Sequence, residues 1–359
     1  MRSTVRSAPV RARWLVTLVG VAAALLVAAP ATALPVGYND DGPRLAVAGA
    51  ALSQSNTQIA RFGVDWETIE PHDDQWDFAS TDAAVDVLRS EGIRPVLAVV
   101  GSPSWAGVGT PGIQCPCDRG ADPEWQQMWQ VVALRYPDVV LEVWNEPNHF
   151  AFGSVSTSRM AELVNEAAAA IWGVDPGRRV LGPPVSPIGR WKEYLASLYK
   201  GINKRVDLAA NFYPYGHLRE NFRADLGTVR RIARKRDVWI TEANVSTGGT
   251  LPVSRAKQAQ MIRFMYSLAK AKHVEAVIFH RFWSPYKVNA SIPFGWDAGQ
   301  SALHADGTPR RMYGVIGKLH RGYRPARLPR IPPAQIPPIT LPPGYIQGVS
   351  GAPTSGCPG

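Results

Sequence analysis

The feature that most constrains the fold is a repeated alternation of short apolar runs and longer amphipathic segments. An apolar run of strand length is followed by a helix-length segment eight times in order. The expected strands cover residues 36–38, 59–64, 95–100, 139–144, 179–181, 206–212, 238–240 and 276–279. The expected helices cover residues 45–55, 81–90, 123–134, 156–171, 190–198, 222–235, 253–271 and 310–319.

Eight strand–helix units in this order predict a parallel sheet whose crossovers are helices. In a stretch of under about 300 residues, eight units favour closure into a (β/α)8 barrel of the TIM type, and an open doubly wound sheet is the structural alternative. No glycine-rich phosphate fingerprint follows any expected strand, which argues against a dinucleotide site. We therefore expect one α/β domain over residues 34–323 and no cofactor.

The two ends of the chain differ from this domain. Residues 1–14 carry four arginines and no acid, Leu15–Ala29 is almost wholly apolar, and Ala31-Thr32-Ala33 fits a cleavage site. That order predicts a secretory signal peptide over residues 1–33, with an uncleaved N-terminal anchor as the alternative. Residues 324–359 are rich in proline and carry no acid, so we expect an extended, disordered tail. The chain should be secreted or associated with the cell envelope, in the second case through its basic tail.

The charge and the cysteines exclude some classes of site. The formal net charge is +10, and four of the positive charges lie in the expected signal peptide. No basic stripe interleaved with aromatic residues appears, so we expect no nucleic-acid partner. The three cysteines, Cys115, Cys117 and Cys357, are odd in number and have no further metal-ligating residues close by. We expect no metal site, and whether these cysteines form disulfides stays open.

Two glutamates follow expected strands at the end of the barrel where active sites of this fold lie. Glu146 follows the fourth strand and Glu242 follows the seventh. Their separation along the chain equals three barrel units of about 31 residues each. Glycoside hydrolysis needs such a pair, because one carboxyl protonates the leaving oxygen while the other attacks the anomeric carbon or activates water. Two carboxyls at close range also push their pKa values apart.

The segment Glu142-Val143-Trp144-Asn145-Glu146-Pro147-Asn148 resembles the strand-4 signature of clan A glycoside hydrolases. It is most similar to family 39, which contains β-xylosidases and α-iduronidases, and to the cellulase-like family 5. Residues 61–66 resemble the second strand of these families and residues 102–106 the end of the third. The resemblance spans about residues 36–322. It implies a retaining glycosidase that acts on an oligo- or polysaccharide, β-linked by default, with its two carboxyls about 5–5.5 Å apart.

Carried over position by position, the resemblance implies that Glu146 is the acid/base and Glu242 the nucleophile. Asn145 would hydrogen-bond the sugar 2-hydroxyl. Arg61 would keep Glu242 ionised, or it would form an ion pair with Glu142 inside the barrel. The further substrate-binding candidates are Tyr213 and Tyr215 after the sixth strand, where relatives show His-x-Tyr, Trp283 after the eighth strand as a floor under the sugar, and Trp105 after the third strand as a stacking surface.

Two other functions fit the same residues. A sugar-binding protein could keep the barrel without catalysis, and a transglycosylase would share every residue named here because only its acceptor differs from water. The loops over residues 107–122 and 284–301 are the longest expected on the active-site face. We expect them to decide which sugar is accepted and whether cleavage is exo or endo.

Overall fold

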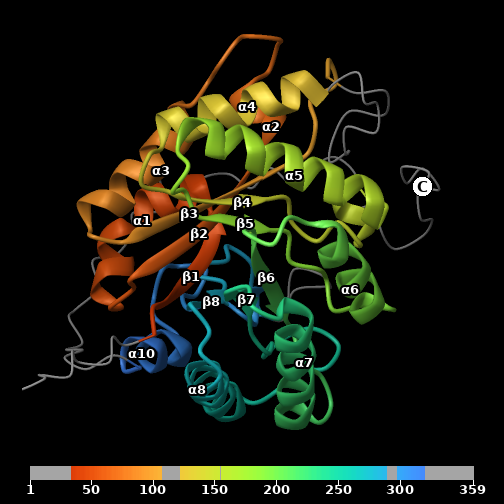
Figure 1. Ribbon diagram of the computed structural model, residues 1–359. Coiled ribbons are helices and arrows are strands. Elements are labelled where there is room, and N and C mark those ends of the chain that lie inside the picture. The colour runs from red at the N-terminus through yellow and green to blue at the C-terminus, as the bar shows by residue number, and fades with distance from the viewer. Residues whose placement is uncertain (1–33, 107–121, 154, 289–296, 320–359) are drawn as a thin grey trace, which may run out of the picture. The chain divides into compact units, whose positions relative to one another are not determined.

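The computed structural model describes residues 34–106, 122–153, 155–288 and 297–319. These residues form a closed barrel of parallel strands in the order β1 to β8, in which β1 pairs with both β2 and β8 (Figure 1). This confirms the predicted (β/α)8 barrel. The predicted signal peptide, the predicted tail and all three cysteines lie outside the described residues, so what was expected of them stays a prediction.

All eight predicted strands are present, with ends that differ from the expected ones by a few residues. The strands are β1 (Val36–Asp41), β2 (Ile59–Asp65), β3 (Arg94–Val100), β4 (Val140–Val143), β5 (Val180–Gly182), β6 (Asp207–Phe212), β7 (Val238–Ala243) and β8 (Ala276–His280). The helices between and after them are α1 (Gly42–Gln54), α2 (Trp66–Ile69), α3 (Ala79–Ser90), α4 (Asp122–Arg135), η2 (Phe150–Phe152), α5 (Thr157–Val174), α6 (Trp191–Gly201), α7 (Leu218–Ala233), α8 (Arg255–Ala271) and α10 (Arg311–Gly317).

Side-chain caps fix where several helices begin. Asp41 Oδ1 accepts a hydrogen bond from the backbone N–H of Arg44 at 3.0 Å at the start of α1. Ser254 Oγ accepts from the backbone N–H of Lys257 at 3.1 Å at the start of α8. Such caps satisfy N–H groups that have no partner inside the first helical turn. The strands therefore pass into their helices at defined residues, and the apolar helix faces pack against the outside of the barrel.

A layer of apolar side chains fills the inside of the barrel and supports the site from below. It consists of Ile59, Val96, Val140, Leu181, Ala209, Trp239, Ala276 and Ile278. Side chains two residues apart on a strand point to the same face. Arg61 and Glu142, two residues beyond Ile59 and Val140, therefore also point inward, one layer nearer the carboxyl ends of the strands. The sequence alternation thus places two charged groups inside the barrel.

A β-bulge interrupts this alternation on β7. Ala210 of β6 pairs with Ile240, but the next residue, Asn211, pairs with Glu242, so Thr241 is an extra residue on β7. A bulge of this kind bends the strand and changes the direction of the following side chain. Because of it, Glu242 lies within β7 and still reaches the interior of the barrel. The predicted seventh strand ended at Ile240, three residues before the end of β7, and β1 likewise extends three residues beyond its predicted end.

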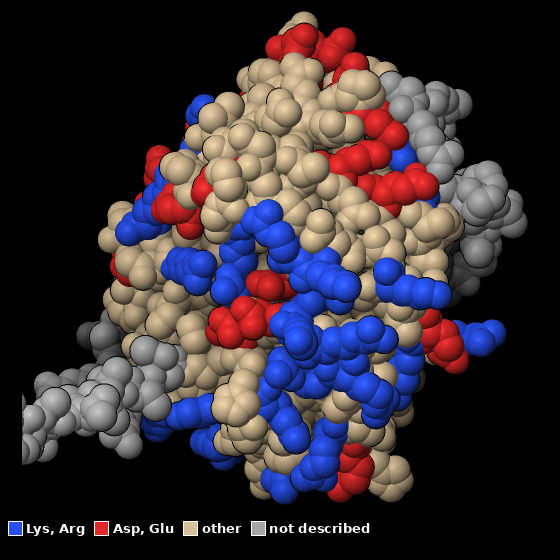
Figure 2. Space-filling view, viewed as in Figure 1, with Lys and Arg blue, Asp and Glu red and all other residues tan. Residues whose placement is uncertain are grey.

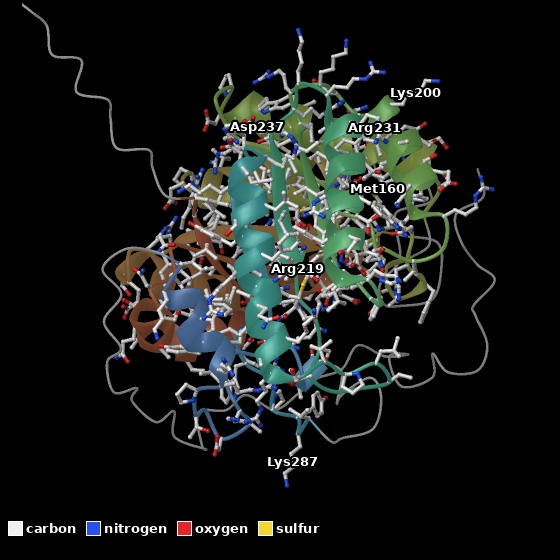
Figure 3. The ribbon with its side chains drawn as sticks, turned by 90° about the horizontal axis from the view of Figure 1, so that it is seen from below. Met160, Lys200, Arg219, Arg231, Asp237 and Lys287 are labelled. Carbon is white, nitrogen blue, oxygen red and sulfur yellow. The ribbon has the colours of Figure 1, made fainter. Side chains whose placement is uncertain are left out.

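Different charged residues mark the two ends of the barrel. Lys200, Arg231 and Asp237 lie at the end where the strands begin, whereas Lys287, which follows β8, lies at the opposite end (Figure 3). Lysine and arginine side chains gather over the α6–α7 region on the face shown in Figure 2. Within the described residues, no helix combines the length and hydrophobicity that crossing a membrane requires.

Candidate active site

Glu242 is held by donors from three other parts of the barrel. Its Oε1 accepts from Asn39 Nδ2 at 2.9 Å and from Arg61 Nη1 at 2.7 Å. Its Oε2 accepts from the hydroxyl of Tyr213. Only 11% of its side chain is exposed. Two neutral donors and a guanidinium therefore converge on this carboxylate, which keeps a small opening to solvent.

Arg61 joins this carboxylate to a second one that is completely buried. Its Nη2 contacts Glu142 Oε1 at 2.6 Å and its Nε contacts Glu142 Oε2 at 3.0 Å. Nη2 also donates to Asn145 Oδ1 at 3.0 Å. Burial alone would lower the pKa of Arg61, but the charges of Glu142 and Glu242 together raise it. Arg61 thus makes both of the contacts considered from the sequence, one with Glu242 and one with Glu142.

Glu146 lies three residues beyond β4 in a backbone conformation that non-glycine residues rarely adopt. Its φ angle is 43° and that of Trp144 is 72°. Left-handed backbone at non-glycine residues costs on the order of 1–3 kcal/mol each and is concentrated at functional sites. The backbone N–H of Glu146 donates to the carbonyl of Pro184 at 2.9 Å, which fixes this turn. Its Oε1 accepts from Asn211 Nδ2 at 2.9 Å.

The electrostatic environment of Glu146 favours its protonated form. Burial is the largest cause, the charge of Glu242 is the second, and together they raise the pKa of Glu146 to about 7. Hydrogen bonds from Asn211 and Ser186 and the charge of Arg61 oppose the shift. Glu242, by contrast, receives a guanidinium and two neutral donors. Two carboxyls with such different surroundings are suited to opposite roles, one as a proton donor and the other as a nucleophile or base.

Asn211 connects the two glutamates. Its backbone pairs with Glu242 across the β6–β7 bulge, and its side chain donates to Glu146. Its Oδ1 accepts from Thr241 Oγ1 at 3.1 Å, which fixes the orientation of the amide. The hydroxyl of the bulge residue Thr241 therefore holds the Asn211 amide with its N–H groups toward Glu146.

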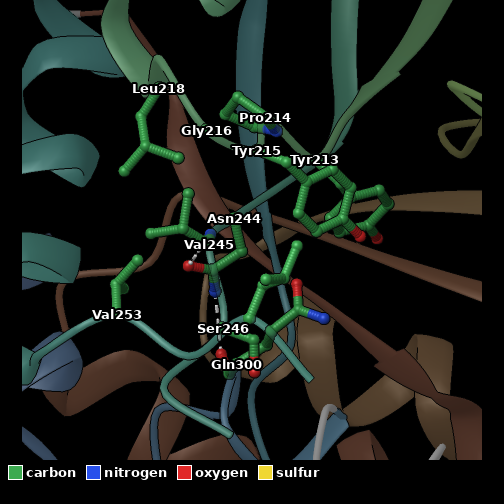
Figure 4. Close-up of a pocket in the computed structure, with 11 residues that line it drawn as sticks. Tyr213, Pro214, Tyr215, Gly216, Leu218, Asn244, Val245, Ser246, Val253 and Gln300 are labelled. Carbon is green, nitrogen blue, oxygen red and sulfur yellow. Dashed lines mark hydrogen bonds between the residues drawn. The ribbon is translucent and has the colours of Figure 1, made fainter. Parts of the chain in front are cut away.

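Tyr213 and Tyr215 follow β6 and differ in their contacts. Tyr213 reaches Glu242, as expected from its place after the sixth strand, and its ring lies edge-on to His280 with 5.9 Å between the ring centroids. Tyr215 is 46% exposed. Both tyrosines line a pocket beside the site, together with Asn244 and Gln300 (Figure 4). Tyr213 is therefore placed at the carboxylate and Tyr215 at the rim.

The two tryptophan candidates lie in different surroundings. Trp105 is half-buried, donates its Nε1–H to the carbonyl of Glu70 at 3.0 Å and packs edge-on against Trp66. Trp283 has no exposed surface and is part of the apolar core. A ring covered on all sides offers no face to a sugar, so the expectation that Trp283 forms a floor under the substrate is not met. The residue of β8 that faces the carboxylate is instead His280.

Asn39, Asn211 and His280 contact the two glutamates or their partners but are not among the predicted site residues. Asn39 lies on β1 and contacts Glu242 from the strand that closes the barrel. The signal available for all three was their position at the carboxyl end of a strand. Polar residues are common there, so position alone did not distinguish them from Asp40 or Asp65.

The described residues contain one cluster of metal-ligating type. The carboxyls of Glu70, Asp73 and Asp74 lie within 4.8 Å of one another, and the two aspartates are exposed. Exposed acidic groups are common on surfaces, and nothing further at this cluster indicates a ligand. The parts of the long loops expected to decide specificity at residues 107–121 and 289–296 lie outside the described residues.

Comparisons with known proteins agree with this fold. Residues 64–217 match the model of glycosyl hydrolases family 39. A family 39 glycoside hydrolase from Bacteroides cellulosilyticus superimposes with a TM-score of 0.61 at 15% identity, covering 80% of this chain and 63% of that one. A family 39 β-xylosidase from Caulobacter crescentus gives 0.57 at 19%, covering 80% and 70%. A family 5 enzyme from Streptomyces cattleya, solved with Manβ1-4GlcNAc, gives 0.65 at 13%, covering 82% of each chain.

These matches confirm the predicted resemblance to clan A glycoside hydrolases of families 39 and 5. The chain spans less than two thirds of the length of the Bacteroides structure. No curated protein sequence matches the chain.

Proposed function

We propose that this chain, with its family 39 segment and its glycosidase fold, is a retaining glycosidase that cleaves β-linked glycans by double displacement. The observation that carries the proposal is the contrast between two buried glutamates linked through Asn211. Glu242 accepts from a guanidinium and two neutral donors, whereas burial and the charge of Glu242 raise the pKa of Glu146 to about 7. One carboxyl is thus suited to attack and the other to donate a proton.

In the first step, Glu146 transfers its proton to the leaving glycosidic oxygen while a carboxylate oxygen of Glu242 attacks the anomeric carbon. The bond between that carbon and the leaving oxygen breaks, and a glycosyl ester on Glu242 forms. In the second step, the ionised Glu146 accepts a proton from water, and the water oxygen displaces Glu242. Retention of configuration requires the two carboxyls about 5–5.5 Å apart, which stays a prediction.

Three neighbours support these steps. Arg61 and Asn39 direct their N–H groups to Glu242 Oε1. This leaves Oε2, which Tyr213 contacts, as the oxygen nearer the opening in this proposal. Asn145, held by Arg61, would hydrogen-bond the sugar 2-hydroxyl. The β-linkage is supported by the similarity in fold to the Caulobacter β-xylosidase.

The test is turnover on a panel of aryl β-glycosides and polysaccharides by wild type, Glu146→Ala and Glu242→Ala. We expect both variants to lose activity. Azide should restore turnover in both, with a β-glycosyl azide from Glu146→Ala and an α-glycosyl azide from Glu242→Ala. Binding of glycans without turnover by the wild type would favour the non-catalytic sugar-binding barrel. Transfer to a sugar acceptor in preference to water would favour a transglycosylase.

We further propose that the chain is exported and meets its substrate outside the cell or at the envelope. The basic, apolar and Ala-x-Ala segments of residues 1–33 support export, and the proline-rich basic residues 324–359 support contact with the envelope. The N-terminal sequence of the protein recovered from culture medium tests the first part. A start at Leu34 is expected, and a chain that keeps residues 1–33 and sediments with membranes would favour the anchor.

A further inference from the structure

His280, the last residue of β8, lies between two groups that can only accept hydrogen bonds from it. Its Nδ1 is 2.8 Å from Asn39 Oδ1, and its Nε2 is 3.2 Å from Asp297 Oδ1. Nδ1 is also 3.8 Å from Glu242 Oε2. The side chain is 16% exposed. One imidazole ring therefore contacts the carboxylate of Asp297 on one side and the Asn39–Glu242 pair on the other.

The orientation of Asn39 determines what the first ring nitrogen must do. Asn39 donates from Nδ2 to Glu242 Oε1, and a carboxylate oxygen cannot serve as the donor there. The amide is therefore oriented with its Oδ1 toward His280. An amide oxygen carries no hydrogen, so the hydrogen between the two atoms has to sit on His280 Nδ1.

Asp297 determines what the second ring nitrogen must do. Its Oδ1 accepts from Arg281 Nη1 at 3.0 Å, and its Oδ2 accepts from Ser284 Oγ at 2.6 Å. Burial alone would raise the pKa of Asp297, but the charge of Arg281 and the hydrogen bond from His280 bring it below its usual range. Asp297 is therefore ionised, and the hydrogen in its contact with His280 has to sit on Nε2. A ring with hydrogens on both nitrogens is an imidazolium.

The charges around the site favour a second cation beside Glu242. Arg61 is shared between Glu142 and Glu242, so one guanidinium faces two carboxylates. The other groups around the ring are Asp297 with its partner Arg281 and the edge-on ring of Tyr213. A positive His280 supplies the second cation next to Glu242. It also prevents the amide of Asn39 from turning its oxygen toward the carboxylate.

We propose that His280 is a positioning residue held by Asp297 as an imidazolium, which fixes the Asn39 amide and balances the charge of Glu242. The inference rests on the proposed function in so far as Glu242 is the nucleophile. His280 does not need to touch the substrate in this role. It acts by keeping Glu242 Oε1 paired with Asn39, so that the carboxylate enters the reaction in one orientation.

The first experiment reads the protonation state of the ring without using activity. Nitrogen-15 NMR of the full-length protein at pH 7 distinguishes a doubly protonated histidine from either neutral tautomer, and the signal that disappears in His280→Gln identifies the residue. We expect both nitrogens of His280 to carry hydrogen, and Asp297→Asn to convert the ring to a neutral form. A neutral His280 in the wild type would overturn the proposal.

The second experiment reads the consequence for catalysis. His280→Gln keeps an N–H donor for Asn39 but removes the charge and the hydrogen bond to Asp297. We expect kcat to fall by about ten- to a hundredfold, the range for loss of a hydrogen bond to a charged group, with little change in KM. His273→Gln, at an exposed histidine before β8, is the control and should leave both constants unchanged. Wild-type kcat in His280→Gln would refute the positioning role. A wild type inactive on every glycoside would contradict the proposed function, whereas the spectrum would still decide the state of His280.

Discussion

The raised pKa of Glu146 makes a quantitative prediction about stability. Free glutamate has a pKa of 4.5, and burial together with the charge of Glu242 raises that of Glu146 to about 7. Between these two values the folded chain binds more protons than the unfolded chain, so the free energy of unfolding falls as the pH rises through this window. The difference between the two pKa values corresponds to about 3 kcal/mol.

Glu146→Gln isolates this contribution because glutamine has nearly the same shape and keeps an oxygen that can accept from Asn211. We expect the variant to gain up to about 3 kcal/mol relative to wild type between pH 4.5 and a pH well above 7. Urea unfolding of both proteins at a series of pH values measures the difference. Asp207, whose pKa burial raises to about 6, titrates in both proteins and cancels. A difference that is constant with pH within about 0.5 kcal/mol would refute the assignment of a buried, raised Glu146.

Three further predictions concern turnover and the interior of the barrel. In wild type, kcat/KM should fall as the pH rises above about 7, because Glu146 then loses the proton that the leaving group needs; a profile flat to pH 9 would contradict this. Tyr213→Phe should lower kcat by about ten- to a hundredfold and lower the free energy of unfolding by about 1.5–3 kcal/mol, since it removes one hydrogen bond to a charged group; steady-state kinetics and urea unfolding measure both. Arg61→Met should lower the free energy of unfolding by about 3–5 kcal/mol because Glu142 is left buried without its cation, and adding Glu142→Gln should recover part of that loss; equal stability of the single and double variants would count against the ion pair.

The barrel can be predicted from the sequence because each strand or helix pattern is recognisable within a short stretch of the chain. Each apolar run of strand length and each amphipathic helix can be recognised from neighbouring residues, and the alternation of strand and helix then limits the topology to parallel arrangements. The same local logic predicted Glu146 and Glu242, since both follow a buried strand. The expectation for Arg61, with either Glu242 or Glu142 as its partner, came from the resemblance to clan A glycoside hydrolases.

The remainder of the site depends on contacts between residues far apart in the chain. Asn39 and His280 meet only because β1 pairs with β8, and nothing near either residue indicates Glu242 as a partner. The bulge at Thr241 could not be read from a strand pattern, although it determines the direction of Glu242. Trp283, by contrast, was predicted for the site and lies in the core. An aromatic residue after a strand fits either a ligand surface or the core, and only packing decides between them.

The most direct test of the proposed mechanism is to trap the covalent intermediate. A fluorinated aryl β-glycoside with a good leaving group, of a sugar that the wild type hydrolyses, should inactivate the enzyme and add the mass of one sugar. Peptide mass spectrometry should then locate that sugar on Glu242, and product analysis should show retained configuration. Attachment at another residue would contradict the assignment of Glu242, and an inverted product with no trapped sugar would contradict double displacement.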